Sequence, residues 1–205
     1  MRLYFKPGAC SLASRIVLIE LGRDFEAVRV DTDAGVTEDG RHYRAVNPRG
    51  YVPTLELEGG EVITENPAVL QYLGDLVPDQ LAPRAGSLDR VRLQEALNFI
   101  SSELHKAFSP FFHGEATGDR LARARAQLSR RIGDVEHMLD HGRPYLLGES
   151  MTVADAYMFV VLNWSDVIGF ELEPWPHVSA FMGRMRERPS VRSAMTQEGL
   201  LKGAA

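Results

Sequence analysis

Cys10 is the only cysteine of the 205-residue chain. It lies between a short apolar run, Leu3 to Phe5, and a stretch with helical periodicity, Ser11 to Leu21, so its sulfur is expected where a strand leads into a helix. Unpaired N–H groups and the macrodipole at a helix N-terminus favour the thiolate, which is the reactive form of cysteine. Free cysteines are also among the most buried residues, so a structural role is the alternative.

A second candidate group is the acid and amide pair that precedes Pro67, namely Glu65 and Asn66. Asn66 is typical of an N-cap, and Glu65 is an acid near the positive end of a helix. The same geometry can bind a carboxylate, because helix N-termini present free N–H groups to anions. From the residues alone, helix capping and ligand binding both remain open.

A third candidate group lies on a helix predicted around residues 97–108. Asn98, Ser102 and His105 fall at i, i+4 and i+7, which forms a polar stripe beside an apolar one, and Lys106 adjoins it. Such a stripe is normally a solvated face. We predict no metal site: only His137 and His141 share a ligand-like spacing, without an evident third ligand, so we interpret them as surface residues.

Composition limits the class of protein. The net charge is −5 and 44% of residues are hydrophobic, which predicts a folded chain without a general field for nucleic acid. The basic run 120–131 is interpreted as a solvated helix face. No apolar stretch reaches the roughly 18 residues of a membrane span, and a lone cysteine suits a reducing compartment. We therefore expect a soluble, cytoplasmic protein that binds neither nucleic acid nor membrane.

Residues 1–80 alternate between strand and helix patterns. Arg2 to Phe5 and Glu26 to Asp31 are predicted strands on either side of the helix that ends near Gly22, a βαβ unit. Two further runs, residues 54–58 and 61–64, flank Gly59-Gly60, a turn that joins antiparallel strands, and Asn66-Pro67 begins a helix. The predicted order is βαβ followed by ββα.

A non-periodic stretch rich in Pro, Ala and Gly, residues 77–87, is the candidate linker. Everything after it shows helical periodicity. Thr152 and Asp155 have the spacing of a capping box before an apolar helix, and Pro176 and Pro189 are each expected to begin another. We therefore predict two domains, an α/β domain over residues 1–80 and an all-helical domain over residues 87–205.

Two segments together, residues 4–12 (YFKPGACSL) and residues 103–106 (ELHK), resemble the bacterial beta class of cytosolic glutathione S-transferases, and the resemblance covers the whole chain. It implies a thioredoxin-like N-terminal domain, an all-α C-terminal domain, a homodimer, and glutathione as co-substrate without a tightly bound cofactor. Two positions depart from the class pattern: Gly35 stands where relatives commonly have a Lys for the glycyl carboxylate, and Phe5 replaces a second Tyr.

The resemblance also implies roles for individual residues. Cys10 is the catalytic cysteine and His105 hydrogen-bonds the sulfur, while a cis Pro53 turns the backbone of Val52 toward the cysteinyl backbone of glutathione. The residues expected to contact glutathione are Val52, Pro53, Glu65, Asn66, Asn98, Ser102, Glu103, His105 and Lys106. Of these, Ser102 and Glu103 are expected to serve the neighbouring subunit's site.

Aromatic residues of the helical half are the expected wall of an apolar pocket for the second substrate, a small hydrophobic electrophile. They are Phe108, Phe112, Tyr157 and Trp164. A helical aromatic set can equally belong to the core.

Three functions remain open at this stage. The first is conjugation of glutathione to hydrophobic electrophiles. The second is thiol chemistry at Cys10, either glutaredoxin-like exchange or reductive dehalogenation with glutathione; Ala13 occupies the place of a second Cys, so a second glutathione would complete the cycle. The third is a carrier that binds apolar ligands without turnover.

Overall fold

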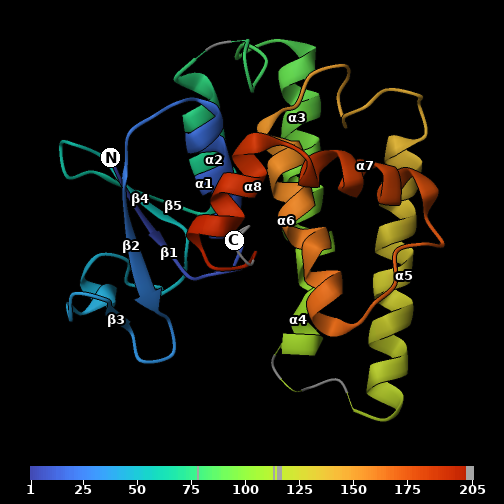
Figure 1. The fold of residues 1–205 in the computed structure, drawn as a ribbon, viewed down its shortest axis with the longest axis horizontal. Helices are drawn as coiled ribbons and strands as arrows, with labels where there is room; N and C mark the ends of the chain where they lie inside the picture. Colours follow the sequence, from blue (N-terminus) through green and yellow to red (C-terminus); the bar gives the residue numbers. More distant parts are fainter. Residues whose placement is uncertain (78, 113, 115–116, 202–205) are drawn as a thin grey trace. The chain divides into compact units, whose positions relative to one another are not determined.

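The computed structural model describes residues 1–77, 79–112, 114 and 117–201, and the chain divides into two compact units (Figure 1). The first contains Met1–Ala82 together with the chain from Arg186 onward, and the second contains Pro83–Met185. The division at Ala82 falls inside the predicted linker. The C-terminal residues differ from the predicted boundaries, because helix α8 (Pro189–Gln197) packs against helix α1 (Ser11–Glu20) of the first unit.

The first unit is built on a five-stranded sheet in the order β3-β2-β1-β4-β5. Strand β1 is parallel to β2 and antiparallel to β4, and β5 forms a hairpin with β4. The strands are β1 Arg2–Phe5, β2 Glu26–Asp31, β3 Val36–Thr37, β4 Thr54–Glu56 and β5 Val62–Thr64. The predicted βαβ and ββα order is confirmed. Strand β3 was missed because two residues carry too little pattern to predict a strand.

Both faces of β1 are buried, which follows from the alternation of side chains along a strand. Leu3 and Tyr4 point to opposite faces and each is fully buried. Tyr4 packs in a cluster with Val28, Val30 and Tyr43, and helix α1 contacts the strand as well. Burial on two sides makes β1 the centre of this unit and gives the segment that follows it a rigid support.

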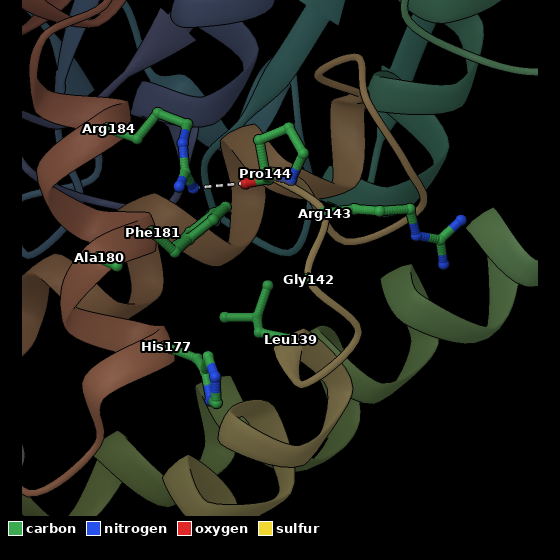
Figure 2. A pocket seen from close by; sticks show the side chains of 8 residues that line it. All are labelled: Leu139, Gly142, Arg143, Pro144, His177, Ala180, Phe181 and Arg184. Carbon is green, nitrogen blue, oxygen red and sulfur yellow. Dashed lines mark hydrogen bonds between the residues drawn. The ribbon is translucent and has the colours of Figure 1, made fainter.

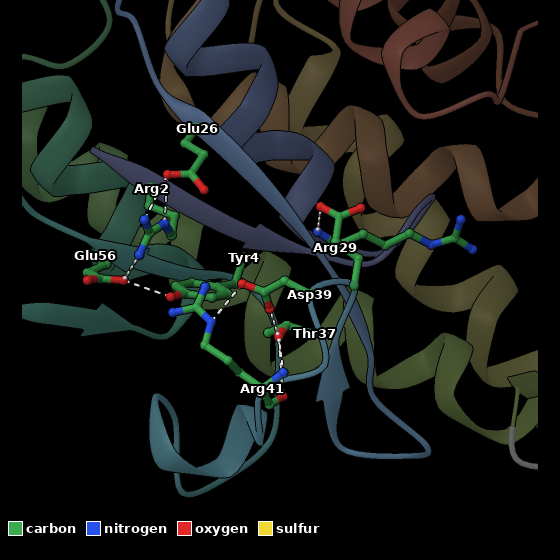
Figure 3. A network of polar contacts seen from close by, with 9 residues as sticks. Arg2, Tyr4, Glu26, Arg29, Thr37, Asp39, Arg41 and Glu56 are labelled. Atoms are coloured by element: carbon green, nitrogen blue, oxygen red, sulfur yellow. Dashed lines mark hydrogen bonds and ion pairs between the residues drawn. The ribbon is translucent and has the colours of Figure 1, made fainter.

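A polar network joins the ends of the central strands (Figure 3). The Tyr4 hydroxyl donates to Glu56 Oε2 at 2.7 Å, and the guanidinium of Arg2 bridges Glu56 to Glu26. The bond from Tyr4 and the charge of Arg2 hold the pKa of Glu56 below its ordinary value. The network therefore ties β2, β1 and β4 together in their observed register.

Three α-helices complete the first unit: α1 Ser11–Glu20, α2 Asn66–Asp75 and α8 Pro189–Gln197, with a short 3-10 turn, η1, at Tyr43–Ala45. Helix α1 contacts both α2 and α8, as the ribbon also shows (Figure 1). Leu12, Ile16 and Val17 of α1 are almost fully buried. The Pro starts predicted for α2 and α8 are confirmed.

Among the described residues of the second unit, the regular elements are helices joined by loops. Its helices are α3 Leu88–Phe99, α4 His105–Phe112, α5 Asp119–Leu139, α6 Val153–Ile168 and α7 Pro176–Arg186, and a π-helical turn, η2, spans Ile100–Leu104. The capping box predicted at Thr152 and Asp155 is present. No helix in the described part of the chain has the length and apolar character needed to cross a membrane.

The π-helical turn changes the prediction for the polar stripe. We expected one continuous α-helix, but η2 separates α3 from α4. The wider turn alters the offset between residues before and after it. Asn98 and Ser102 are exposed, and Ser102 donates to the Asn98 carbonyl, whereas His105 is only partly exposed. The solvated stripe therefore does not include His105.

Candidate functional site

Cys10 lies where the sequence predicts it, as the N-cap residue of α1. Its Sγ donates to the Val52 carbonyl at 3.4 Å, and the residue is partly exposed. The N–H of Ser11, the first of the helix, has no partner among the residues that the structure describes. An unpaired donor beside the sulfur leaves a place for a second sulfur or an anion.

The loop before β4 presents a backbone donor to the same region. The Val52–Pro53 peptide bond is cis, as the resemblance implies. The Val52 carbonyl accepts from Cys10, while its N–H has no partner within the described ranges. This free N–H and the adjacent carbonyl can pair with an extended peptide ligand as a strand would.

Asn66 connects the starts of α1 and α2. Its side chain is nearly buried: Nδ2 donates to the Cys10 carbonyl at 3.1 Å, and Oδ1 accepts from Ser14 at 2.9 Å. The amide therefore orients the cysteine backbone from inside the protein. The backbone N–H of Asn66, which has no partner in the described part of the chain, is the group that can reach a ligand carboxylate.

A buried ion pair that the sequence pattern does not predict supports the Cys10 loop. Arg15 Nε lies 3.0 Å from Glu198 Oε1, with side chains 4% and 0% exposed, and Glu198 also accepts the Gly8 N–H at 2.9 Å. Burial raises the pKa of Glu198, an effect that the Gly8 N–H and Arg15 oppose. A charged residue inside the apolar run of α1 was the available signal, since buried charges are normally paired.

In the second unit, the predicted aromatic residues form a cluster that includes His105. Its Nδ1 is hydrogen-bonded to the Tyr157 hydroxyl at 2.9 Å, and its ring packs edge-on against Trp164. Phe108 and Phe112 also meet Trp164 edge-on, with ring centroids 5.7 and 5.5 Å away. Four predicted pocket residues and the predicted catalytic histidine thus form one cluster within this unit.

Burial of His105, with a smaller contribution from the charge of Lys106, lowers its pKa to about 4. The imidazole is therefore neutral at pH 7, whereas the neighbouring Lys106 is exposed.

This lowered pKa predicts how stability depends on pH. Below pH 6.5 the unfolded chain binds a proton at His105 that the folded protein accepts only near pH 4. Stability should therefore fall by up to about 3 kcal/mol from this group as pH drops through that window. In urea unfolding from pH 4.5 to 7.5, the free energy of unfolding of His105→Gln should change less with pH than that of the parent. The control His42→Gln, at an exposed position, should match the parent; a parent-like slope in His105→Gln would contradict the prediction.

The remaining predicted residues of this unit are exposed. Asn98, Ser102, Glu103 and Lys106 all face solvent, and Glu103 pairs with Arg131 of α5 at 2.8 Å. Cys10 belongs to the first unit and His105 to the second.

The second unit also contains a cavity of about 280 Å³ that the sequence did not indicate (Figure 2). Leu139 and Phe181 line it, and Arg184 donates to the Pro144 carbonyl at its edge. None of the predicted pocket residues contributes to it.

Among the described residues no group of three or more His, Cys, Asp or Glu side chains could hold a metal ion, and both ring nitrogens of His141 have backbone partners.

The structure explains why position 35 is a glycine where beta-class relatives commonly have a Lys. Gly35 has a φ of +71°, the left-handed region that residues with a Cβ seldom adopt. A Lys at this position would need a differently shaped loop.

The fold and the site define a class of protein. A thioredoxin-like unit carries a cysteine at its first strand-to-helix junction and a cis proline before β4, and it is followed by a helical unit. Two family models match: glutathione S-transferase, N-terminal domain, over residues 8–76, and glutathione S-transferase, C-terminal domain, over residues 99–189.

Individual proteins agree with these family matches. The chain is 45% identical to "Glutathione S-transferase GstA" of Escherichia coli O157:H7, over 98% of this chain and all of that protein. A beta-class glutathione S-transferase from Sphingomonas chungbukensis superposes with a TM-score of 0.93 at 42% identity, and a sphingomonad glutathione S-transferase complexed with glutathione superposes with a TM-score of 0.92 at 42% identity. Each of these two superpositions covers 98% of this chain and 100% of the other chain. The chain belongs to the glutathione S-transferase family and resembles its bacterial beta class.

Proposed function

We propose that this enzyme conjugates glutathione to small hydrophobic electrophiles at a site beside Cys10. That it is a glutathione transferase with glutathione as co-substrate follows from its family. The observation that carries the site assignment is the convergence of Cys10, the free N–H of Val52 and the free N–H of Asn66 within one unit. In this role the protein lowers the pKa of the bound thiol and holds the sulfur near its acceptor.

The glutathione backbone is proposed to pair with Val52 beside Pro53, with the γ-glutamyl carboxylate at the N–H of Asn66. Glu65 is exposed and carries the negative charge that an α-ammonium group requires. This division of roles uses the side chain of Glu65 and the backbone of Asn66, because the amide of Asn66 is already bonded to Cys10 and Ser14.

The helical unit is proposed to supply the rest of the site. His105 would hydrogen-bond the sulfur as a neutral imidazole, Lys106 would stabilise the thiolate, and the aromatic cluster around Trp164 would contact the electrophile. We further propose a cytoplasmic homodimer, in which Ser102 and Glu103 contact glutathione in the neighbouring subunit, and Asn98 as a further glutathione contact. The exposure of these three side chains supports that role.

Thiol exchange at Cys10 is the second candidate function, favoured by the partial exposure of Cys10 and the free N–H of Ser11. The Cys10 thiolate would attack the glutathione sulfur of a mixed disulfide, form a Cys10–glutathione disulfide and release the other thiolate. A second glutathione thiolate would then restore the Cys10 thiolate and leave as oxidised glutathione.

Kinetics with an aryl halide test the proposed function. The parent enzyme should turn over, and Glu65→Gln should raise the KM for glutathione by about ten- to a hundredfold with kcat little changed, because Glu65 binds a part of glutathione remote from the sulfur. Glu61→Gln, on the exposed turn before β5, is the control and should leave KM unchanged. Displacement of a bound dye without any turnover would instead favour the carrier hypothesis.

A further inference from the structure

Arg49 lies in the loop between η1 and β4, and its side chain contacts Glu65. Arg49 Nη1 donates to Glu65 Oε1 at 2.9 Å. Within the described ranges, Arg49 is the only side-chain partner of this carboxylate. Arg49 belongs to neither of the segments that carry the family resemblance, residues 4–12 and 103–106.

The backbone of Glu65 explains why its carboxylate needs an external partner. Glu65 is the N-cap residue of α2, where an acidic side chain ordinarily accepts an N–H of its own helix. Here φ is +67° and ψ is 114°, a conformation uncommon outside glycine, and the side chain makes no cap bond. The carboxylate is directed to Arg49 instead, which leaves the start of α2 open to a ligand.

Arg49 is itself held by a buried residue. Its backbone N–H donates to Asn47 Oδ1 at 3.1 Å, and Asn47 is 3% exposed. Asn47 Nδ2 donates to the Tyr51 carbonyl at 2.8 Å and to Thr54 Oγ1 at 3.1 Å. One buried amide therefore supports both the residue that contacts Glu65 and the loop that leads into Val52.

We propose that Arg49 is a positioning residue for glutathione: it holds the Glu65 carboxylate so that its second oxygen can accept the α-ammonium group of the γ-glutamyl end. This inference rests on the proposed function of Glu65. A carboxylate has lone pairs for both cations, so the ligand does not need to displace Arg49. A Glu side chain that is already ordered also loses less rotamer freedom when glutathione binds.

Solvent exposure determines where the effect of Arg49 can be measured. The side chains of Arg49 and Glu65 are 63% and 62% exposed, and such surface ion pairs contribute little to folding stability. The contribution should therefore appear in glutathione binding and be absent from the unfolding transition.

The test is a glutathione titration of Arg49→Gln at saturating aryl halide in low salt. We expect the KM for glutathione to rise by about three- to tenfold, with kcat and Tm unchanged. Arg49→Lys keeps the positive charge and should have a KM close to that of the parent. The difference between Arg49→Gln and the parent should shrink in about 1 M NaCl, where exposed charges are screened. Arg23→Gln, which removes one positive charge at the opposite end of α1 from Cys10, is the matched control and should keep the parent KM.

A double variant separates positioning from direct binding. In a Glu65→Gln background, Arg49→Gln should add no further increase in KM, because its effect passes through the carboxylate. An equal increase in both backgrounds, or an unchanged KM in the single variant, would overturn the inference. Failure of the proposed function would look different: the parent enzyme itself would show no glutathione-dependent turnover, or Glu65→Gln would bind glutathione as the parent does.

Discussion

Replacing Cys10 by Ala should lower reduction of a glutathione mixed disulfide by roughly a hundredfold or more, because the nucleophile of that reaction is lost. Conjugation should fall by only about tenfold, the equivalent of one hydrogen bond to a charged group of about 1.5 kcal/mol. The difference arises because the attacking sulfur in conjugation belongs to glutathione. The free N–H groups of Ser11 and Val52 remain in the variant to orient it.

Parallel assays of the two reactions measure this separation, and Cys10→Ser is the matched control. Ser keeps a donor at the position that now bonds the Val52 carbonyl, so its conjugation rate should lie closer to that of the parent. It should still fail to reduce the mixed disulfide. Equal losses of both activities in Cys10→Ala would mean that a covalent Cys10 step also lies on the conjugation path.

Replacing Glu198 by Ala should destabilise the protein by about 3–5 kcal/mol, the usual cost of removing one partner of a buried ion pair. The side chain of Arg15 is 4% exposed and would be left as an uncompensated buried charge. The Gly8 N–H, two residues before Cys10, would lose its acceptor at the same time. Urea unfolding measures the loss of stability, and the rate of Cys10 alkylation reports whether the loop has changed.

Two variants control this experiment. Glu187→Ala removes an 80% exposed carboxylate from an ion pair of the same C-terminal region and should change stability by less than about 0.5 kcal/mol. Arg15→Met combined with Glu198→Met removes both charges and should recover most of the stability, since no buried charge remains unpaired. If Glu198→Ala costs less than about 1 kcal/mol, the pair is not the support that its burial indicates.

The candidate site could be predicted where its residues act through local structure. Cys10 at a strand-to-helix junction, Pro67 at a helix start and the capping box at Asp155 each depend on neighbours a few residues away. Hydrophobic periodicity and helix-start signals carry such information within a short window. Those predictions agree with the structure.

Other features depend on which distant segments meet. The partners of Arg15 and Arg49 lie 183 and 16 residues further along the chain, and no spacing rule connects them. The π-helical turn before His105 has no signal in a pattern that reads as one continuous helix.

The sequence alone therefore determined the order of the elements, the family resemblance and the position of Cys10 at the strand-to-helix junction, because local propensity and motif spacing encode them. Only the tertiary structure decided that desolvation keeps the half-buried His105 neutral, that the Asn66 amide bonds to Cys10 from inside the protein, and that Glu198 supports the cysteine loop. Burial and pairing arise when packed elements exclude water from a polar group. That condition depends on contacts between distant residues and cannot be read from either residue separately.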